Sequence, residues 1–277
     1  MTPSDARRLF CDDIAAGDAE IDLARAALHV AQEEQPALDV DACVGRLDGL
    51  AATVAPELAA FHAPVDAIAR MRELFSREGF RGNELDYFDP ANSFLDQVLE
   101  RRVGIPLTLS IVYLEVGWRC ALPLAGVGFP GHFLVKYVEP GADHFIDPFE
   151  GARQVTVAEL RGRMGAMFGD GAVLRPEHLA AASKRDMLVR LNANLKTVYT
   201  DRGDLTRALA AVERILLLTP DDAAEIRDRG LLYLGLQAYR LAAVDLERYL
   251  DARPDADDAS DVRAQLDAAS RERVRLN

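Results

Sequence analysis

Residues 126–149 read GVGFPGHFLVKYVEPGADHFIDPF, and this stretch decides the fold expected of the chain. Residues 133–138 are mostly β-branched, aromatic or aliphatic, which is typical of a strand. Pro140 and Gly141 suit the centre of a tight turn, because proline presets φ and glycine accepts a positive φ. Residues 144–147 return as a second strand, which the following proline ends because it has no N–H for the ladder. The stretch therefore predicts an antiparallel hairpin in an α+β protein.

A histidine and an aspartate fall on one face of this hairpin. With the turn centred on Pro140 and Gly141, Leu134 lies opposite Asp147. His132, two residues earlier, is then a diagonal neighbour of Asp147 at roughly 7–8 Å between Cα atoms. A carboxylate at that separation can hold an imidazole in one tautomer, as in a nucleophile–His–Asp triad. The alternative is structural, since a histidine after Pro-Gly is common in loops and an aspartate before proline is common in turns. His132 and Asp147 are the candidate catalytic residues.

The segment before the hairpin predicts a buried helix. Residues 107–120 are apolar almost all round, and Pro106 fits a first helical turn, where its missing N–H has no cost. The segment is shorter than the ~20 residues of a membrane span and contains Glu115. The N-terminus of such a helix is where the macrodipole would stabilise a cysteine thiolate.

Motifs spread over residues 82–149 carry a resemblance to a known family. They are Gly82-Asn83, Tyr87, Asn92-Ser93, Val98-Leu99, Arg101-Arg102, Gly104-Ile105-Pro106, Gly128-Phe129-Pro130-Gly131-His132-Phe133 and Asp147-Pro148-Phe149. The chain resembles a bacterial branch of the transglutaminase-like superfamily that joins this core to C-terminal tetratricopeptide repeats; animals have a similar domain in an F-box protein. The resemblance implies a papain-like α+β core with a small antiparallel sheet. It also implies a cysteine at the start of the core helix, with His132 and Asp147 as the family's histidine and aspartate.

The chain departs from that pattern at the cysteine, whose position falls at or near Pro106. The nearest hydroxyls, Thr108 and Ser110, lie inside the helix, where such side chains usually bond to a preceding carbonyl. Cys120 lies at the opposite end, where the dipole would raise the pKa of a thiol, so we expect it to pack as a small apolar group. No nucleophile is therefore identified.

Composition narrows the remaining classes. A formal charge of −13 argues against nucleic-acid binding, which needs a basic surface. The N-terminus lacks the apolar core of a signal peptide. Three cysteines without regular spacing fit a reducing cytosol, so we expect a cytoplasmic protein that does not bind membranes. No histidine or cysteine pair has metal-ligand spacing, and the glycines of residues 161–171 lack a closing Gly-Lys-Ser/Thr, so no metal or cofactor is expected.

The chain divides into a core and a repeat region. We expect a transglutaminase-like domain at 1–165, with 1–80 mostly helical, a glycine-rich linker at 166–186 and helical repeats at 187–277. Ala208, Glu213, Arg214, Leu216, Pro220 and Asp221 recur 34 residues later as Ala242, Glu247, Arg248, Leu250, Pro254 and Asp255. A period of 34 with a proline after the second helix is typical of tetratricopeptide repeats.

Two functions follow. The first is a non-catalytic adaptor, a pseudoenzyme whose repeats bind a protein or peptide partner. The second is an acyl-transfer or peptide-hydrolysis enzyme, in which His132 is the general base, Asp147 orients it and the nucleophile is unidentified. The missing cysteine favours the adaptor.

Overall fold

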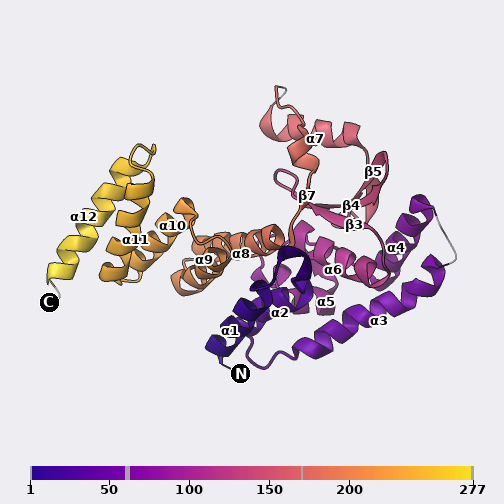
Figure 1. The fold of residues 1–277 in the computed structure, drawn as a ribbon, viewed down its shortest axis with the longest axis horizontal. Coiled ribbons are helices and arrows are strands. Elements are labelled where there is room, and N and C mark those ends of the chain that lie inside the picture. The colour runs from indigo at the N-terminus through magenta and orange to yellow at the C-terminus, as the bar shows by residue number, and fades with distance from the viewer. Residues whose placement is uncertain (1, 60–62, 170, 276–277) are drawn as a thin grey trace. The chain divides into compact units, whose positions relative to one another are not determined.

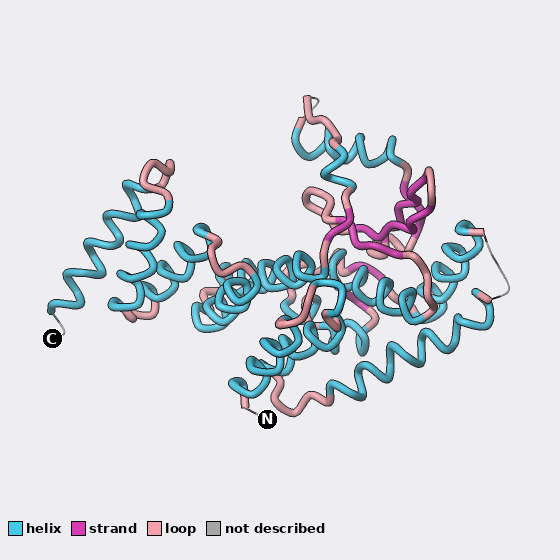
Figure 2. Tube along the Cα trace, viewed as in Figure 1, coloured by secondary structure: helices cyan, strands magenta, loops and turns pink. Residues whose placement is uncertain are grey.

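The computed structural model describes residues 2–59, 63–169 and 171–275. Its contacts divide the chain into two compact units, Met1–Met187 and Leu188–Asn277. Figure 1 shows the helices and strands of both units, and Figure 2 shows the strands of the first unit side by side. In the described ranges, no helix combines the length and the apolar character that crossing a bilayer requires.

The first unit begins with helices whose starts are set by local chemistry. The side chains of Thr2, Asp22 and Asp39 accept backbone N–H groups at three of these starts, and a proline occupies the first turn of the fourth helix. The helices are α1 (Pro3–Ile14), α2 (Leu23–Glu34), α3 (Val40–Leu58) and α4 (Pro64–Glu78), with a short 3-10 helix, η1 (Asp18–Glu20), after α1. The expectation of a mostly helical N-terminal region is confirmed.

The core helix α6 (Pro106–Arg119) is buried at every position from Pro106 to Gly117, as its apolar sequence predicts. A 3-10 helix, η2 (Pro90–Asn92), and α5 (Leu95–Arg101) precede it. Two short strands, β1 (Arg81–Gly82) and β2 (Val103–Gly104), pair in parallel just before α6. This pairing ties the tip of α6 to the loop that follows α4.

A five-stranded antiparallel sheet packs against α6. Its strands are β3 (Leu124–Val127), β4 (Leu134–Glu139), β5 (Ala142–Asp147), β6 (Arg153–Val155) and β7 (Ala181–Ala182), in the order β6-β5-β4-β3-β7. β4 and β5 form the predicted hairpin. Glu139 pairs with Ala142 across the turn and Val135 pairs with Ile146, which places Leu134 opposite Asp147. The α+β class and the register argued from the turn are both confirmed.

The helix α7 (Val157–Phe168) covers one face of the sheet, while α6 contacts β3 and β4 (Figure 1). Leu160 and Met164 of α7 pack on Phe129, Leu134 and Phe145. Thr156 starts α7 with a capping box, in which it bonds Glu159 reciprocally. The side chains on this face therefore lie between the sheet and α7.

Residues 166–169 and 171–186 contain regular elements where a linker was expected. They contain the end of α7, a 3-10 helix, η3 (Pro176–Leu179), and β7, which pairs with β3. Burial of apolar side chains accounts for this structure, because Ala172, Leu174 and Leu179 pack against the hydrophobic cluster between the sheet and α7. This segment completes the first unit.

The last residues of the first unit are fastened to its beginning. The carboxylate of Asp18 accepts the backbone N–H of Lys184 at 3.2 Å and that of Arg185 at 2.9 Å, and so caps the start of α8 (Lys184–Asp201). The Lys184 ammonium donates to the carbonyl of Ile21 at 2.6 Å. These bonds join residues more than 160 positions apart.

The second unit consists of antiparallel helices. The rest of α8 is followed by α9 (Leu205–Leu218), α10 (Ala223–Gly235), α11 (Tyr239–Ala252) and α12 (Ala259–Arg275). Each helix from α9 to α12 packs on the next, as the 34-residue period predicts. Ala208 and Ala242, which correspond in the two repeats, are both fully buried between helices.

Candidate functional site

The structure brings the two candidate catalytic residues together. Nε2–H of His132 donates to both carboxylate oxygens of Asp147, at 2.9 and 3.0 Å. His132 lies in the turn two residues before β4, not at the start of the strand, because Gly131 turns the chain at a φ of 68°. Asp147 is the last residue of β5. The predicted dyad geometry exists, with Nδ1 as the second nitrogen of the ring.

Asp147 is the centre of a denser network than the sequence suggested. Its carboxylate is fully buried and also accepts Nη1–H of Arg163, at 2.8 Å, and the backbone N–H groups of Phe149 and Glu150, at 3.1 and 3.3 Å. Burial alone would raise the pKa of Asp147, but His132 and Arg163 outweigh it and hold the pKa below its usual range. Asp147 is therefore a buried anion whose carboxylate oxygens both accept hydrogen bonds from the protein.

Arg163 and Glu150 were missed by the sequence analysis. Arg163 comes from α7 and reaches Asp147 from the face that α7 covers, while its Nη2–H donates to Glu150 at 2.9 Å. Its place in a glycine-rich run concealed it. The capping-box spacing of Thr156 and Glu159 was the available signal, since it predicts the start of a helix that contains Arg163.

The aromatic ring of Phe149 lies beside His132 and fixes this end of the hairpin to the rest of the core. The two rings meet edge to face, 5.9 Å between centroids. A β-carbon placed on Gly82 would lie 2.5 Å from the Phe149 ring, and the N–H of Gly82 donates to the carbonyl of Phe149 at 3.2 Å. Glycine at position 82 thus permits the close approach of β1 to the loop after β5. Tyr87 packs on the same ring at 6.2 Å.

The partly exposed side of His132 opens on a cavity of about 340 Å³. The residues that line it are Phe129, Gly131, His132, Arg163, Ala166 and Met167. They come from the loop before β4 and from α7, and none of them carries a thiol or a hydroxyl. The side of the imidazole available to a ligand therefore faces α7.

The tip of α6, where the family pattern expects a cysteine, is closed. Pro106 is the first residue of the helix and is buried. Thr108 is fully buried, and its hydroxyl is engaged both as a donor and as an acceptor. It donates to the carbonyl of Asn92 at 2.7 Å and accepts the N–H of Ile105 at 3.2 Å. Ser110 is also fully buried, and its hydroxyl has no hydrogen-bond partner among the described residues. These side chains support the helix rather than face a cavity.

The three cysteines are free thiols away from this site. Cys120 lies at the C-terminal end of α6, where Sγ–H donates to the carbonyl of Ala51 at 3.6 Å and burial raises the pKa of the thiol. Burial likewise raises the pKa of Cys43 on α3. Cys11 lies on α1 and is half-buried. Among the residues described, no group of three or more histidine, cysteine, aspartate or glutamate side chains is placed to hold a metal.

The second unit has a groove of its own between α8 and α10, with a volume of about 380 Å³. Its lining residues are Lys196, Thr197, Thr200, Asp201, Asp228, Leu231 and Leu232. Lys196 crosses it as an ion pair with Glu225 at 2.6 Å and Asp228 at 3.0 Å. The buried Arg214 of α9 donates Nε–H to Asn192 of α8 at 2.5 Å, whereas its counterpart Arg248 is exposed. The two repeats thus have corresponding helices, but the same arginine position is buried in one repeat and exposed in the other.

Comparison with known proteins agrees with both units. A model of the transglutaminase-like superfamily matches residues 41–193, and a tetratricopeptide repeat model matches residues 195–267. A UPF0162 protein of Xylella fastidiosa is 38% identical over 267 residues, 94% of each chain. A UPF0162 protein of Pseudomonas aeruginosa is 32% identical over 228 residues, 82% of this chain and 83% of its own. Protein SirB1 of Salmonella typhimurium is 26% identical over 236 residues, 83% and 86% of the two chains. No solved structure matches significantly.

Proposed function

The chain belongs to the transglutaminase-like superfamily, among the bacterial UPF0162 and SirB1 proteins, and from that premise we propose that it is a non-catalytic adaptor. In this proposal the first unit is a pseudoenzyme core and the helical repeats bind a protein or peptide partner. The partner is neither a nucleic acid nor a membrane, and the adaptor works in the cytoplasm. The net charge of −13 supports the exclusion of nucleic acids, and the three free cysteines support a cytoplasmic location.

One observation carries the proposal: the cavity beside His132 is bounded by α7 and contains no nucleophile. In a Cys–His or Ser–His pair the nucleophile lies within hydrogen-bond reach of the base. Here the hydroxyl of Thr108 is committed to Asn92 and Ile105, and the thiol of Cys120 lies at the far end of α6. The His132–Asp147 pair is then retained for structure, because a buried carboxylate needs partners.

The groove between α8 and α10 supports the binding half of the proposal. It is concave, has the aliphatic side chains Leu231 and Leu232 beside threonines, and contains charged groups that could fix a peptide's orientation. Leu231 is 37% exposed, which leaves apolar surface available to a partner. Repeats of this kind generally bind peptides along such a surface.

The enzyme remains the second candidate, because one observation favours it. The bond from Nε2–H of His132 to Asp147 leaves Nδ1 as the basic nitrogen, and the histidine side chain is 16% exposed toward a cavity. An oriented, accessible imidazole can act as a general base if a nucleophile is supplied.

Complementation of a deletion strain tests the two candidates together. The adaptor proposal expects His132→Gln, which can still bond Asp147, to restore the phenotype fully. Leu231→Arg should fail to restore it, because the long cation fills the groove. Leu236→Arg is the matched control: this leucine is equally exposed, lies at the end of α10 and does not line the groove.

The result that would overturn the adaptor is loss of function in His132→Gln with an unchanged urea midpoint. Incubation of the wild-type protein with a glutamine-containing peptide gives an independent readout. Ammonia release above the buffer blank that disappears in His132→Gln would establish the enzyme instead.

A further inference from the structure

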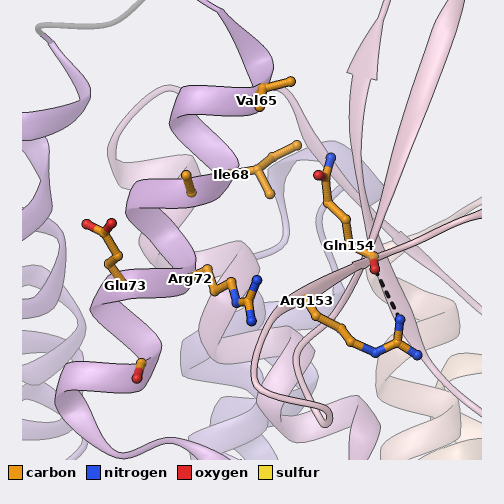
Figure 3. Close-up of a pocket in the computed structure, with 8 residues that line it drawn as sticks. Val65, Ile68, Arg72, Glu73, Arg153 and Gln154 are labelled. Carbon is orange, nitrogen blue, oxygen red and sulfur yellow. Dashed lines mark hydrogen bonds between the residues drawn. The ribbon is translucent and has the colours of Figure 1, made fainter.

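A separate cavity of about 610 Å³ lies between α4 and β6 and shares no lining residue with the His132 cavity (Figure 3). It is lined by Val65, Ile68, Ala69, Arg72, Glu73, Ser76, Arg153 and Gln154. The first six recur at helical spacing along one face of α4, and the last two belong to β6. We propose that this cavity binds a carboxylate carried beside a short aliphatic group, as in the end of a peptide chain with an apolar last residue.

Arg72 is the cationic group that makes the proposal specific. Three arginines of α4 lie within eight residues, and two of them have acidic partners: Arg70 pairs with Glu73 at 2.6 Å and Arg77 with Glu57 at 3.6 Å. Arg72 makes no hydrogen bond or ion pair among the described residues. Figure 3 shows its side chain extending from α4 toward β6. A guanidinium with all its donors available is the side chain best suited to bind a carboxylate through two parallel bonds.

The opposite strand supplies two polar side chains, of which Arg153 is already held in place. Arg153 is fixed by Glu150 at 2.6 Å and Glu159 at 2.8 Å, and its Nη1–H also donates to the carbonyl of Gln154. Its Nη2 has no partner among the described residues. The Gln154 amide makes no hydrogen bond within the described residues either and points along the cavity beside Ile68 in Figure 3. An amide in that position can bond the backbone of a bound peptide. Arg153, which its two acidic partners hold in place, is preorganised, and this lowers the entropic cost of binding.

The other end of the cavity has an apolar wall that suits the aliphatic part of the ligand. Val65 is 56% exposed at the start of α4, next to the buried Ile68 and to Ala69. Exposed valine and the positively charged Arg72 are thus separated by two turns of one helix. The volume is within the range of sites that hold small ligands, and it suits two or three residues of peptide. The chain has a net charge of −13, so an arginine with no acidic partner among the described residues provides a local positive site that favours an anion.

The test is isothermal titration of the full chain with N-acetyl-Val-Leu bearing a free C-terminal carboxylate, against the same dipeptide as its amide. The acid should bind about tenfold or more tightly than the amide, because a charge-assisted bidentate bond is lost in the amide. Arg72→Gln should bring the affinity for the acid down to that for the amide. Arg77→Gln removes the same charge from the same helix outside the cavity and should leave the affinity unchanged.

Two further arms define the ligand. Val65→Ser should weaken the dipeptide about fivefold and leave acetate binding unchanged, since it removes only apolar contact. N-acetyl-Val-Glu-amide places the carboxylate on a side chain; binding equal to the free acid assigns the source to an acidic side chain, and weaker binding assigns it to a chain terminus. The proposal is overturned if acid and amide bind equally, if neither binds in the millimolar range, or if Arg72→Gln binds like the wild type.

Discussion

The hairpin end and the tip of α6 correspond to the two halves of one catalytic pattern, and they differ in what their side chains do for the fold. At the hairpin, Asp147 is a buried anion bonded by His132, Arg163 and two backbone N–H groups. At the helix tip, Pro106 fills a position whose N–H would have no partner in any helix. Losing the histidine or the aspartate would remove hydrogen bonds from this buried network, whereas a cysteine at the tip could be lost without such a cost. Under the adaptor proposal, the needs of the fold are therefore sufficient reason for the His132–Asp147 pair to be present.

Replacing Asp147 by alanine should have the largest effect. The change removes the buried acceptor that His132 and Arg163 share and that two backbone N–H groups also use, so we expect a loss of about 3–5 kcal/mol in the free energy of unfolding. Urea denaturation measures it. A loss below about 1 kcal/mol would show that the hairpin end is not held by this carboxylate, and the contrast with the helix tip would fail.

The hydroxyls of Thr108 and Ser110, near the start of α6, sharpen the comparison at the tip. Thr108→Val keeps the shape but removes the bonds to Asn92 and Ile105, which should cost about 1–3 kcal/mol. Ser110→Ala removes a buried hydroxyl that has no partner in the described residues, and should change stability by less than about 0.5 kcal/mol. Equal losses in the two variants would mean that Ser110 has a role the described contacts do not explain.

The dependence of stability on pH distinguishes the contribution of the Asp147 charge from the contribution of its packing. Its folded-state pKa lies below the unfolded value, so its contribution is present above about pH 4 and disappears as the pH falls through the folded pKa. The difference in unfolding free energy between wild type and Asp147→Asn should therefore shrink as the pH is lowered from about 5 toward 2. Urea midpoints at a series of pH values measure it. A difference that stays constant would assign the effect to packing alone.

Pro106→Cys probes whether the two halves still act together. The substitution should cost only about 0.5–1 kcal/mol, mainly through the greater freedom of the unfolded chain. Because position 106 is buried and His132 faces α7, the new thiol should resist iodoacetamide until the protein unfolds. The rate should be the same in a His132→Gln background. A fast reaction that depends on His132 would restore the catalytic reading of the site.

The elements that the sequence predicted correctly have local causes. The turn at Pro140 and Gly141 determined the register that brings His132 to Asp147, and the apolar circumference of α6 determined its burial. The 34-residue period gave the repeat helices, because each repeat carries the same pattern. These features depend on neighbours in the chain, so a single sequence contains them.

The features that could not be predicted depend on contacts across the fold. Arg163 contributes to the site only because α7 lies over the sheet, and the capping-box spacing of Thr156 and Glu159 signals the helix without specifying the residues that it packs against. Residues 172–179 are held by apolar side chains that pack on a cluster from β3, β4, β5, β6, α7 and the loop before β4. Arg72 has no partner among the described residues, and this too depends on its surroundings, since Arg70 and Arg77 on the same helix have partners.

The bonds from Asp18 to the start of α8 have a consequence for synthesis on the ribosome. The N-terminal residues leave the exit tunnel long before Lys184 and Arg185 are made. During that time Asp18 has no α8 to cap, and β7 is not yet present to pair with β3. The first unit can close only when translation has almost reached the repeats. During that interval the nascent chain exposes an incomplete sheet edge, the kind of surface that chaperones shield and that aggregation exploits.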